Sequence, residues 1–149
     1  STTTPDPLPD MGEHIIEYAL HFHKEGWSVG NSMAVGEEFN IPLVSLNCGF
    51  QKGILPSFKS LVELENKNVR LVSLKMSEDS KKIIIRLVET EGKKTIANIS
   101  ISSELFDTTL EAVCVNSLEQ PLKNNTTQIK NGKLHVEIPA YGIVTVSLS

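Results

Sequence analysis

The stretch TTQIKNGKLHVEI, residues 126–138, decides the fold class of this chain. Asn131 and Gly132 at its centre both tolerate the positive φ angles of a type I′ turn, the two-residue turn whose twist matches that of the strands it joins. The residues on either side form short runs typical of strands. We therefore predict an antiparallel hairpin formed by residues 126–130 and 133–138.

The chain on both sides of this hairpin has the same organisation, with short runs rich in Val, Ile and Leu between turn residues. These runs predict further strands at residues 43–46, 58–64, 69–76, 83–89, 95–102, 110–115 and 143–148. Residues 77–82 and the pair Glu91-Gly92 each separate two runs by a few polar residues, which is typical of hairpin loops and predicts antiparallel neighbours.

Two further segments precede these strands. Residues 14–23 alternate between the apolar side chains of Ile16, Tyr18, Leu20 and Phe22 and a polar face that carries Glu17, His21 and His23, which predicts a half-buried strand. Residues 32–39 predict a short helix that Pro42 ends, within an insertion richer in Gly and charge. About eight strands with one short helical insertion predict an all-β fold, an antiparallel β-sandwich.

The domain organisation follows from length and from the proline pattern. The first ten residues contain Pro5, Pro7 and Pro9 and no initiator Met, so we expect a linker or tail at residues 1–9 and a single β-sandwich domain at residues 10–149. A chain of 149 residues can build a sizeable core without staples. Cys48 and Cys114 are too few for a disulfide framework and predict reduced, buried thiols in a cytoplasmic protein.

Composition excludes several classes of partner. Fourteen Lys and Arg residues stand against eighteen Asp and Glu residues, which gives a net charge of -4, and no basic cluster offsets this charge locally. Such a chain repels phosphate backbones and anionic lipid headgroups, so we expect neither nucleic acid nor a membrane surface as a partner. No apolar run approaches the ~20 residues of a membrane-spanning helix.

The histidines are the first candidates for a metal-binding site. His21 and His23 would share one strand face with Glu17, and two imidazoles and a carboxylate could hold Zn²⁺. Nothing in the sequence fixes Glu17 close enough to complete such a site. A polar strand face, solvated or docked on another domain, is therefore the favoured interpretation.

Other candidate catalytic groups have ordinary explanations. Asp10, Glu13 and His14 surround Gly12, and a carboxylate beside a histidine could form an acid–base pair, but such local pairs are common on surfaces. Glu78 and Asp79 are adjacent carboxylates in a predicted turn, where neighbours usually face water. Gly-x-Ser-x-Gly and phosphate-binding Gly-rich patterns do not occur in the sequence. We expect no catalytic and no metal-binding residues in this chain.

An ordered set of short motifs resembles the α-mannosidases of glycoside hydrolase family 38. Asp10-Met11-Gly12-Glu13-His14, followed by Tyr18-Ala19-Leu20 and His23, is similar to a segment at the entry to their C-terminal β-domain. The later matches are Asn40-Ile41-Pro42, residues 68–79, Arg86-Leu87-x-Glu89 with Gly92, and Pro139 with Ile143, Thr145 and Leu148. The resemblance runs from about Asp10 to the last residue and is to the cytosolic and bacterial branch.

This resemblance implies a parent enzyme that is a retaining α-mannosidase. In that family a divalent cation, Zn²⁺ or similar, and an Asp nucleophile belong to an N-terminal barrel, so no family catalytic or metal residue maps onto this chain. The resemblance implies an accessory domain without a cofactor of its own, whose partners are the N-terminal catalytic domain and, for the parent enzyme, a mannose-containing glycan. Candidate interdomain or cleft-edge residues are Asp10, His14, His21 and His23.

Two other functions stay open at this point. The chain could be a carbohydrate-binding β-sandwich module that grips sugar rings through Trp27 and neighbouring aromatic residues. It could also be an interaction or scaffold domain without a connection to sugars, because a sandwich fold alone does not determine function.

Overall fold

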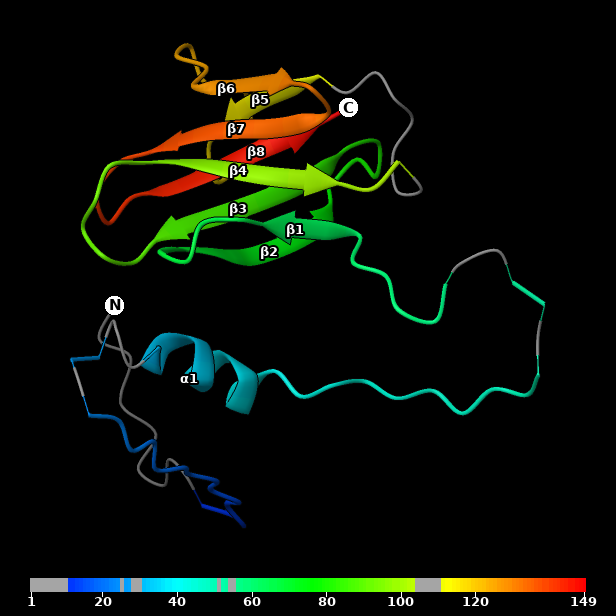
Figure 1. Ribbon diagram of the computed structural model, residues 1–149, viewed down its shortest axis with the longest axis vertical. Helices are drawn as coiled ribbons and strands as arrows, with labels where there is room; N and C mark the ends of the chain where they lie inside the picture. Colours follow the sequence, from blue (N-terminus) through cyan, green and yellow to red (C-terminus); the bar gives the residue numbers. More distant parts are fainter. Residues whose placement is uncertain (1–10, 25, 28–30, 51, 54–55, 104–110) are drawn as a thin grey trace. The chain divides into compact units, whose positions relative to one another are not determined.

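The computed structural model describes residues 11–24, 26–27, 31–50, 52–53, 56–103 and 111–149. The chain divides into two compact units, Ser1–Phe50 and Gln51–Ser149, which we call the N-terminal unit and the sandwich unit. All the strands of the described residues lie in the sandwich unit (Figure 1). The domain boundaries expected from the sequence, at residues 1–9 and 10–149, stay a prediction.

The N-terminal unit contains the helix α1, Ser32–Asn40, which confirms the predicted short helix. Ala34 is its buried residue. The helix ends where the Asn40 side-chain amide donates a hydrogen bond of 2.7 Å to the Gly36 carbonyl and the Ile41 N–H donates one of 2.8 Å to the Glu37 carbonyl. The next residue is Pro42, which has no N–H with which to continue the ladder.

The sandwich unit is built from two four-stranded antiparallel sheets. Sheet A has the order β1-β4-β7-β6 and consists of β1 (Val62–Leu64), β4 (Thr95–Ile101), β7 (Lys133–Ile138) and β6 (Thr127–Lys130). Sheet B has the order β2-β3-β8-β5 and consists of β2 (Val69–Met76), β3 (Ile83–Glu89), β8 (Ile143–Leu148) and β5 (Ala112–Val115). The predicted all-β sandwich of about eight strands with one short helix is confirmed.

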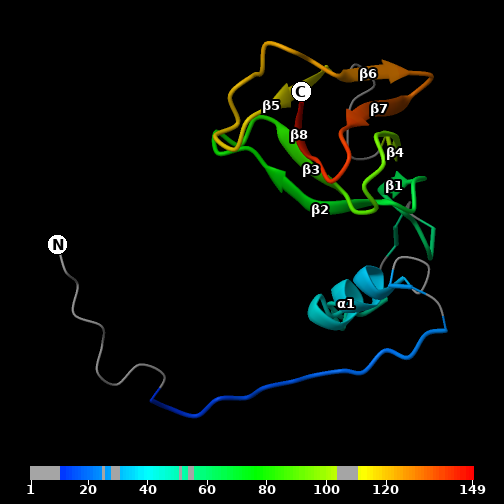
Figure 2. The ribbon, with the colours of Figure 1, turned by 90° about the vertical axis from the view of Figure 1, so that its left-hand side faces the viewer.

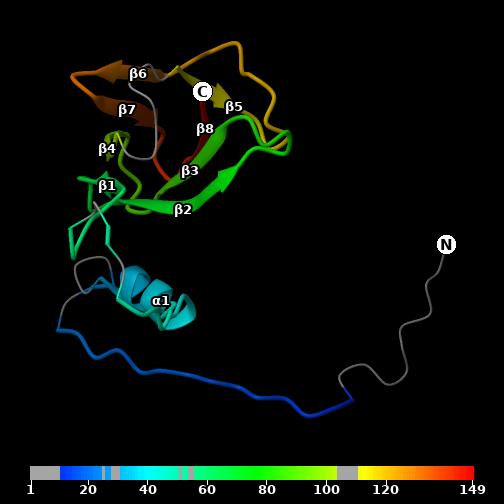
Figure 3. The same ribbon diagram turned by 90° about the vertical axis from the view of Figure 1, so that its right-hand side faces the viewer.

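The hydrophobic core fills the space between the two sheets, which face each other in Figures 2 and 3. Successive side chains of a strand point to opposite faces, so alternate residues enter this space. Sheet B contributes Ile85 and Leu87, and sheet A contributes Leu134, Val136 and Ile138. Burial of each such side chain stabilises the fold by roughly 1.5–3 kcal/mol.

The turns test the predicted hairpins. Asn131 and Gly132 have φ angles of 53° and 73° and join β6 to β7, so the hairpin that decided the fold class is confirmed. Residues 77–82 join β2 to β3 as predicted. The hairpin predicted at Glu91-Gly92 is wrong, because β3 lies in sheet B and β4 lies in sheet A.

Two predicted strands are also wrong. Residues 14–23 and 43–46 are extended but form no strand, although the first segment alternates apolar and polar side chains and the second is rich in Leu and Val. A strand needs a neighbour that takes up its backbone hydrogen bonds, and within the described residues no segment pairs with either. The predicted strand 58–64 shortens to β1 for the same reason, and the first residue of the predicted strand 110–115 lies outside the described residues.

The two cysteines differ in burial. Both thiols are free, as expected, and Cys114 is buried, with its sulfur 3.4 Å from the Thr126 hydroxyl. Cys48 is exposed, so the prediction of two buried thiols is wrong for this residue. Its neighbours belong to an extended segment without a pairing strand, which provides nothing to cover the thiol.

Candidate functional site

Three of the four candidate residues from the sequence fall in residues 11–24, which we call the histidine segment. It is an extended stretch of the N-terminal unit, and His14, His21 and His23 are all exposed in it. Asp10 lies outside the described residues. Three of the four candidate residues can therefore be placed, all on one exposed stretch.

The structure brings two of these residues together. The ring centroids of His21 and His23 are 5.3 Å apart, with the ring planes tilted by 32°. A spacing of two residues in an extended chain puts side chains on the same side, so this pairing follows from the sequence. Because the segment forms no strand, the pair does not lie on a sheet.

A metal centre at these rings would need further ligands. A structural zinc site uses four protein ligands and a catalytic site uses three. In the part of the chain that the structure describes, no group of three or more His, Cys, Asp and Glu side chains is placed to hold a metal ion. The two imidazoles therefore stand as a pair and do not belong to a ligand set of described residues.

The apolar side of the histidine segment is its most unusual property. Ile16, Tyr18, Leu20 and Phe22 are between 76 and 88% exposed. Single exposed apolar residues are ordinary, whereas a row of four large apolar side chains is unusual on the surface of a monomeric protein. We call these four residues the apolar row.

The adjacent carboxylates Glu78 and Asp79 stabilise the β2–β3 turn. Asp79 accepts hydrogen bonds of 2.5 Å from the Ser77 hydroxyl and 3.2 Å from the Lys81 N–H, and these lower the pKa of its carboxyl group. Glu78 forms an ion pair of 3.0 Å with Lys75. The two groups shape the turn and are not arranged as a pair of opposed catalytic carboxylates.

A different carboxylate, Glu89 at the end of β3, is buried, with 1% of its surface exposed. Its side chain accepts five hydrogen bonds of 2.8–3.1 Å, and the donors are the backbone N–H groups of Glu91, Gly92, Lys93 and Tyr141 and the side-chain amide of Asn68. Burial by itself would raise the pKa of Glu89. The hydrogen bonds, led by those from Tyr141 and Glu91, outweigh it and lower this pKa to about 2.

Glu89 explains why Glu91-Gly92 is not a hairpin loop. By binding three successive N–H groups, its carboxylate folds the chain after β3 into a corner that leads to the other sheet. Gly92 has a φ of 75°, and a Cβ atom on it would lie 2.6 Å from the Tyr141 ring. Only glycine can adopt this positive φ without strain and also leave room for the Tyr141 ring.

Sequence reasoning missed this role of Glu89, although the pair Glu89 and Gly92 belongs to the quoted resemblance. The available signal was an acidic residue three positions before a glycine at the end of an apolar strand. The partner that completes the arrangement, Tyr141, is 52 residues away in the sequence. Local pattern therefore could not reveal it.

The comparisons with known proteins agree with this geometry. The model of the glycosyl hydrolases family 38 C-terminal beta sandwich domain matches residues 68–146, more than half of the chain. The matched range begins at Asn68, includes Glu89, Gly92 and Tyr141, and ends within β8. No curated protein matches the chain. In the described residues no helix is long and apolar enough to cross a membrane. The chain belongs to the family of glycosyl hydrolase family 38 C-terminal β-sandwich domains.

Proposed function

We propose that this chain is the non-catalytic accessory domain of a retaining, metal-dependent α-mannosidase. The observation that carries the proposal is the family match over residues 68–146, which makes the chain an accessory domain of a glycoside hydrolase. The motifs between Asp10 and His23, which resemble the entry to the same β-domain in α-mannosidases, support the narrower substrate class.

The carboxylates of the described residues support the non-catalytic part of the proposal. A retaining glycosidase needs two carboxyl groups about 5–5.5 Å apart across the scissile bond, one of which carries a proton. Glu89 has a pKa of about 2 and is enclosed by its five donors, so it holds no proton to give at neutral pH. Asp79 and Glu78 are engaged in the β2–β3 turn.

In this proposal the nucleophile, the acid and the divalent cation reside in an N-terminal catalytic domain of the parent protein. The apolar row is the contact surface for that domain, because large apolar side chains gain free energy when they leave water. An extended segment can also add as a strand to the edge of a partner's sheet, and residues 14–23 are extended without belonging to a strand of either sheet. His14, His21 and His23 would then lie at the edge of the contact.

The proposal is tested with an aryl α-mannoside and added Zn²⁺ or Co²⁺. The 149-residue chain should leave the substrate intact, and the parent protein encoded by the complete reading frame should hydrolyse it with retention of the anomeric configuration. An aryl α-glucoside serves as the control for substrate class. Turnover by the 149-residue chain would contradict its non-catalytic role, and a parent protein that cleaves only the glucoside would contradict the substrate class.

A further inference from the structure

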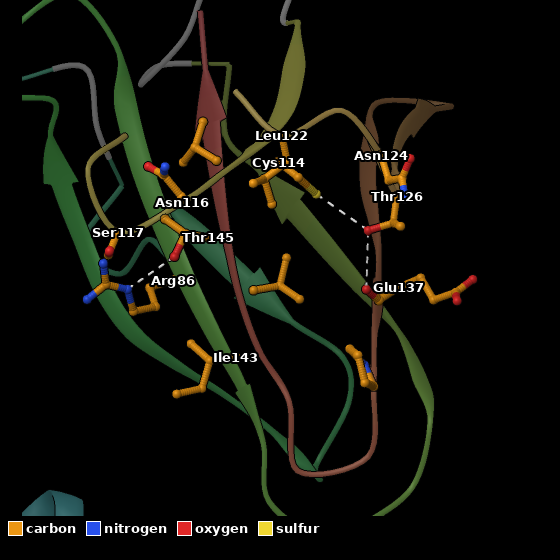
Figure 4. A pocket seen from close by; sticks show the side chains of 13 residues that line it. Arg86, Cys114, Asn116, Ser117, Leu122, Asn124, Thr126, Glu137, Ile143 and Thr145 are labelled. Atoms are coloured by element: carbon orange, nitrogen blue, oxygen red, sulfur yellow. Dashed lines mark hydrogen bonds between the residues drawn. The ribbon is translucent and has the colours of Figure 1, made fainter. Parts of the chain in front are cut away.

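A pocket of about 570 Å³ lies in the sandwich unit at the point where β5 ends (Figure 4). Residues of β5 pair with β8 only from Leu148 to Thr145, so Ile143 and Val144 of β8 extend beyond it. The chain that follows β5, including Leu122, forms another wall. The volume falls within the roughly 300–1,000 Å³ that is typical of small-molecule sites.

The wall of this pocket is mainly apolar. Its apolar side chains come from β5, β8, the turn between β7 and β8, and the connection between β5 and β6; they are Val115, Val144, Ile143, Pro139 and Leu122. None of the residues that line it carries an aromatic ring. Sugar rings are usually held by stacking on aromatic faces, so this wall suits an aliphatic group better than a hexose.

Arg86 is the one cationic residue in the lining. It lies opposite Thr145 in the pairing of β3 with β8, on the face of sheet B that points away from Ile85 and Leu87 of the core. Its Nε donates a hydrogen bond of 3.2 Å to the Thr145 hydroxyl. Among the described residues the two terminal nitrogens of the guanidinium have no partner, which leaves their donors available to a ligand.

The other polar groups of the lining are mostly engaged. The Asn116 side chain binds the backbone of Leu118 and both the backbone and the side chain of Gln120 within its own loop. The Thr126 hydroxyl contacts the Cys114 thiol at 3.4 Å and the Glu137 carbonyl at 3.4 Å.

Glu137 does not neutralise Arg86. Its carboxylate forms an ion pair of 2.5 Å with Lys94, and Figure 4 shows it directed away from the Arg86 guanidinium. The pocket therefore combines an aliphatic wall with one uncompensated positive charge.

We propose that this pocket binds a small aliphatic carboxylate. The carboxylate pairs with the terminal nitrogens of Arg86, because the planar guanidinium matches a carboxylate with two parallel hydrogen bonds. The aliphatic body lies against Leu122 and Ile143, and the Ser117 hydroxyl, which also lines the pocket, is placed to donate to the ligand. This site is separate from the proposed mannosidase function and does not depend on it.

Hexanoate is the probe for this site, and hexanamide, which has the same length without the charge, is its control. Titration of the ¹⁵N-labelled 149-residue chain at neutral pH with hexanoate should give saturable amide shifts at residues 114–117 and 143–145. Hexanamide should bind at least tenfold more weakly. Equal binding of the two probes, or no saturable shift at these residues, would overturn the proposal.

Substitutions test whether Arg86 provides the positive charge that binds hexanoate. Arg86→Gln should weaken hexanoate binding at least tenfold and leave hexanamide binding unchanged, whereas Lys123→Gln, which removes a nearby positive charge outside the lining, should change neither. Ser117→Asp on the exposed loop provides a second variant in case Arg86→Gln does not fold. Its added negative charge should also weaken hexanoate binding at least tenfold. Wild-type affinity in Ser117→Asp, or tighter binding of methyl α-mannoside than of hexanoate, would overturn the proposal.

Discussion

The backbone N–H of Tyr141 donates a hydrogen bond of 2.9 Å to the carboxylate of Glu89. The donor lies in the turn between β7 and β8, and the acceptor ends β3. The same carboxylate oxygen also accepts hydrogen bonds from the N–H groups of Gly92 and Lys93. The connection from β3 to β4 and the connection from β7 to β8, which both cross between the sheets, therefore meet at this one side chain. All of these residues lie within residues 68–146, the range that the family model matches.

Glu89→Gln tests how much this carboxylate stabilises the sandwich. A glutamine offers one acceptor oxygen and turns an NH₂ group towards N–H donors, so at least one buried donor loses its partner. We expect the free energy of unfolding to fall by about 2–4 kcal/mol, since each buried unsatisfied donor costs about 1–3 kcal/mol. Urea unfolding measures the change. Glu63→Gln on the exposed position of β1 is the control, and equal effects of the two substitutions would contradict the role of Glu89.

The pH dependence of stability provides an independent test of Glu89. Its pKa falls from 4.5 to about 2 on folding, so the unfolded chain binds more protons than the folded chain between these values. The stabilisation from Glu89 is complete above pH 4.5 and is lost as the pH falls towards 2. Urea unfolding from pH 2 to 7 should show stability rising with pH, and Glu89→Gln should flatten the rise. If the free energy of unfolding rises equally with pH in the wild type and the variant, carboxylates other than Glu89 cause the rise.

Gly92→Ala tests the contact between this corner and Tyr141. Gly132→Ala is a matched control, because the two glycines have φ angles of 75° and 73° but a Cβ atom on Gly132 would meet nothing within 4 Å. Both substitutions should destabilise the domain by roughly 1–2 kcal/mol through backbone strain. Gly92→Ala should cost more, because its Cβ also collides with the Tyr141 ring. The excess should vanish in a Tyr141→Ala background; if it persists there, the ring contact is not its cause.

The sequence predicts the sandwich well because most of its strands are specified locally. Asn131 and Gly132 demand one turn type, and the runs of Val, Ile and Leu have lengths that fit only strands between turns. The corner at Glu91-Gly92 was predicted wrongly because its geometry depends on Tyr141, whose contact with Glu89 exists only in the folded chain. Local residue types could not distinguish a loop within one sheet from a crossing between two.

The candidate site was predicted less completely. The spacing of His21 and His23 correctly brings their rings to one side, because that relation is local. The strand expected for residues 14–23 depends on a pairing partner, and alternation alone cannot supply one. The pocket beside Arg86 escaped prediction because its walls come from strands and connections far apart in the sequence.

The apolar row gives a prediction that compares the chain with its parent protein. Tyr18→Asp combined with Phe22→Asp should leave the urea midpoint of the 149-residue chain unchanged, because both side chains are exposed in it. In the proposed parent mannosidase the same pair of substitutions should lower the thermal midpoint and the rate of hydrolysis. Each side chain forfeits roughly 1.5–3 kcal/mol when it can no longer be buried against the catalytic domain.

Leu118→Asp is the control for this comparison, because Leu118 is an exposed apolar residue of the connection between β5 and β6 and lies outside the apolar row. It should leave both proteins unchanged. Limited proteolysis supplies a second readout, since undocking exposes residues 11–24 to cleavage in the parent protein. A double variant of the parent with wild-type stability and wild-type resistance to proteolysis would mean that the row is not the docking surface. The exposed row would then face solvent in the parent as it does in this chain.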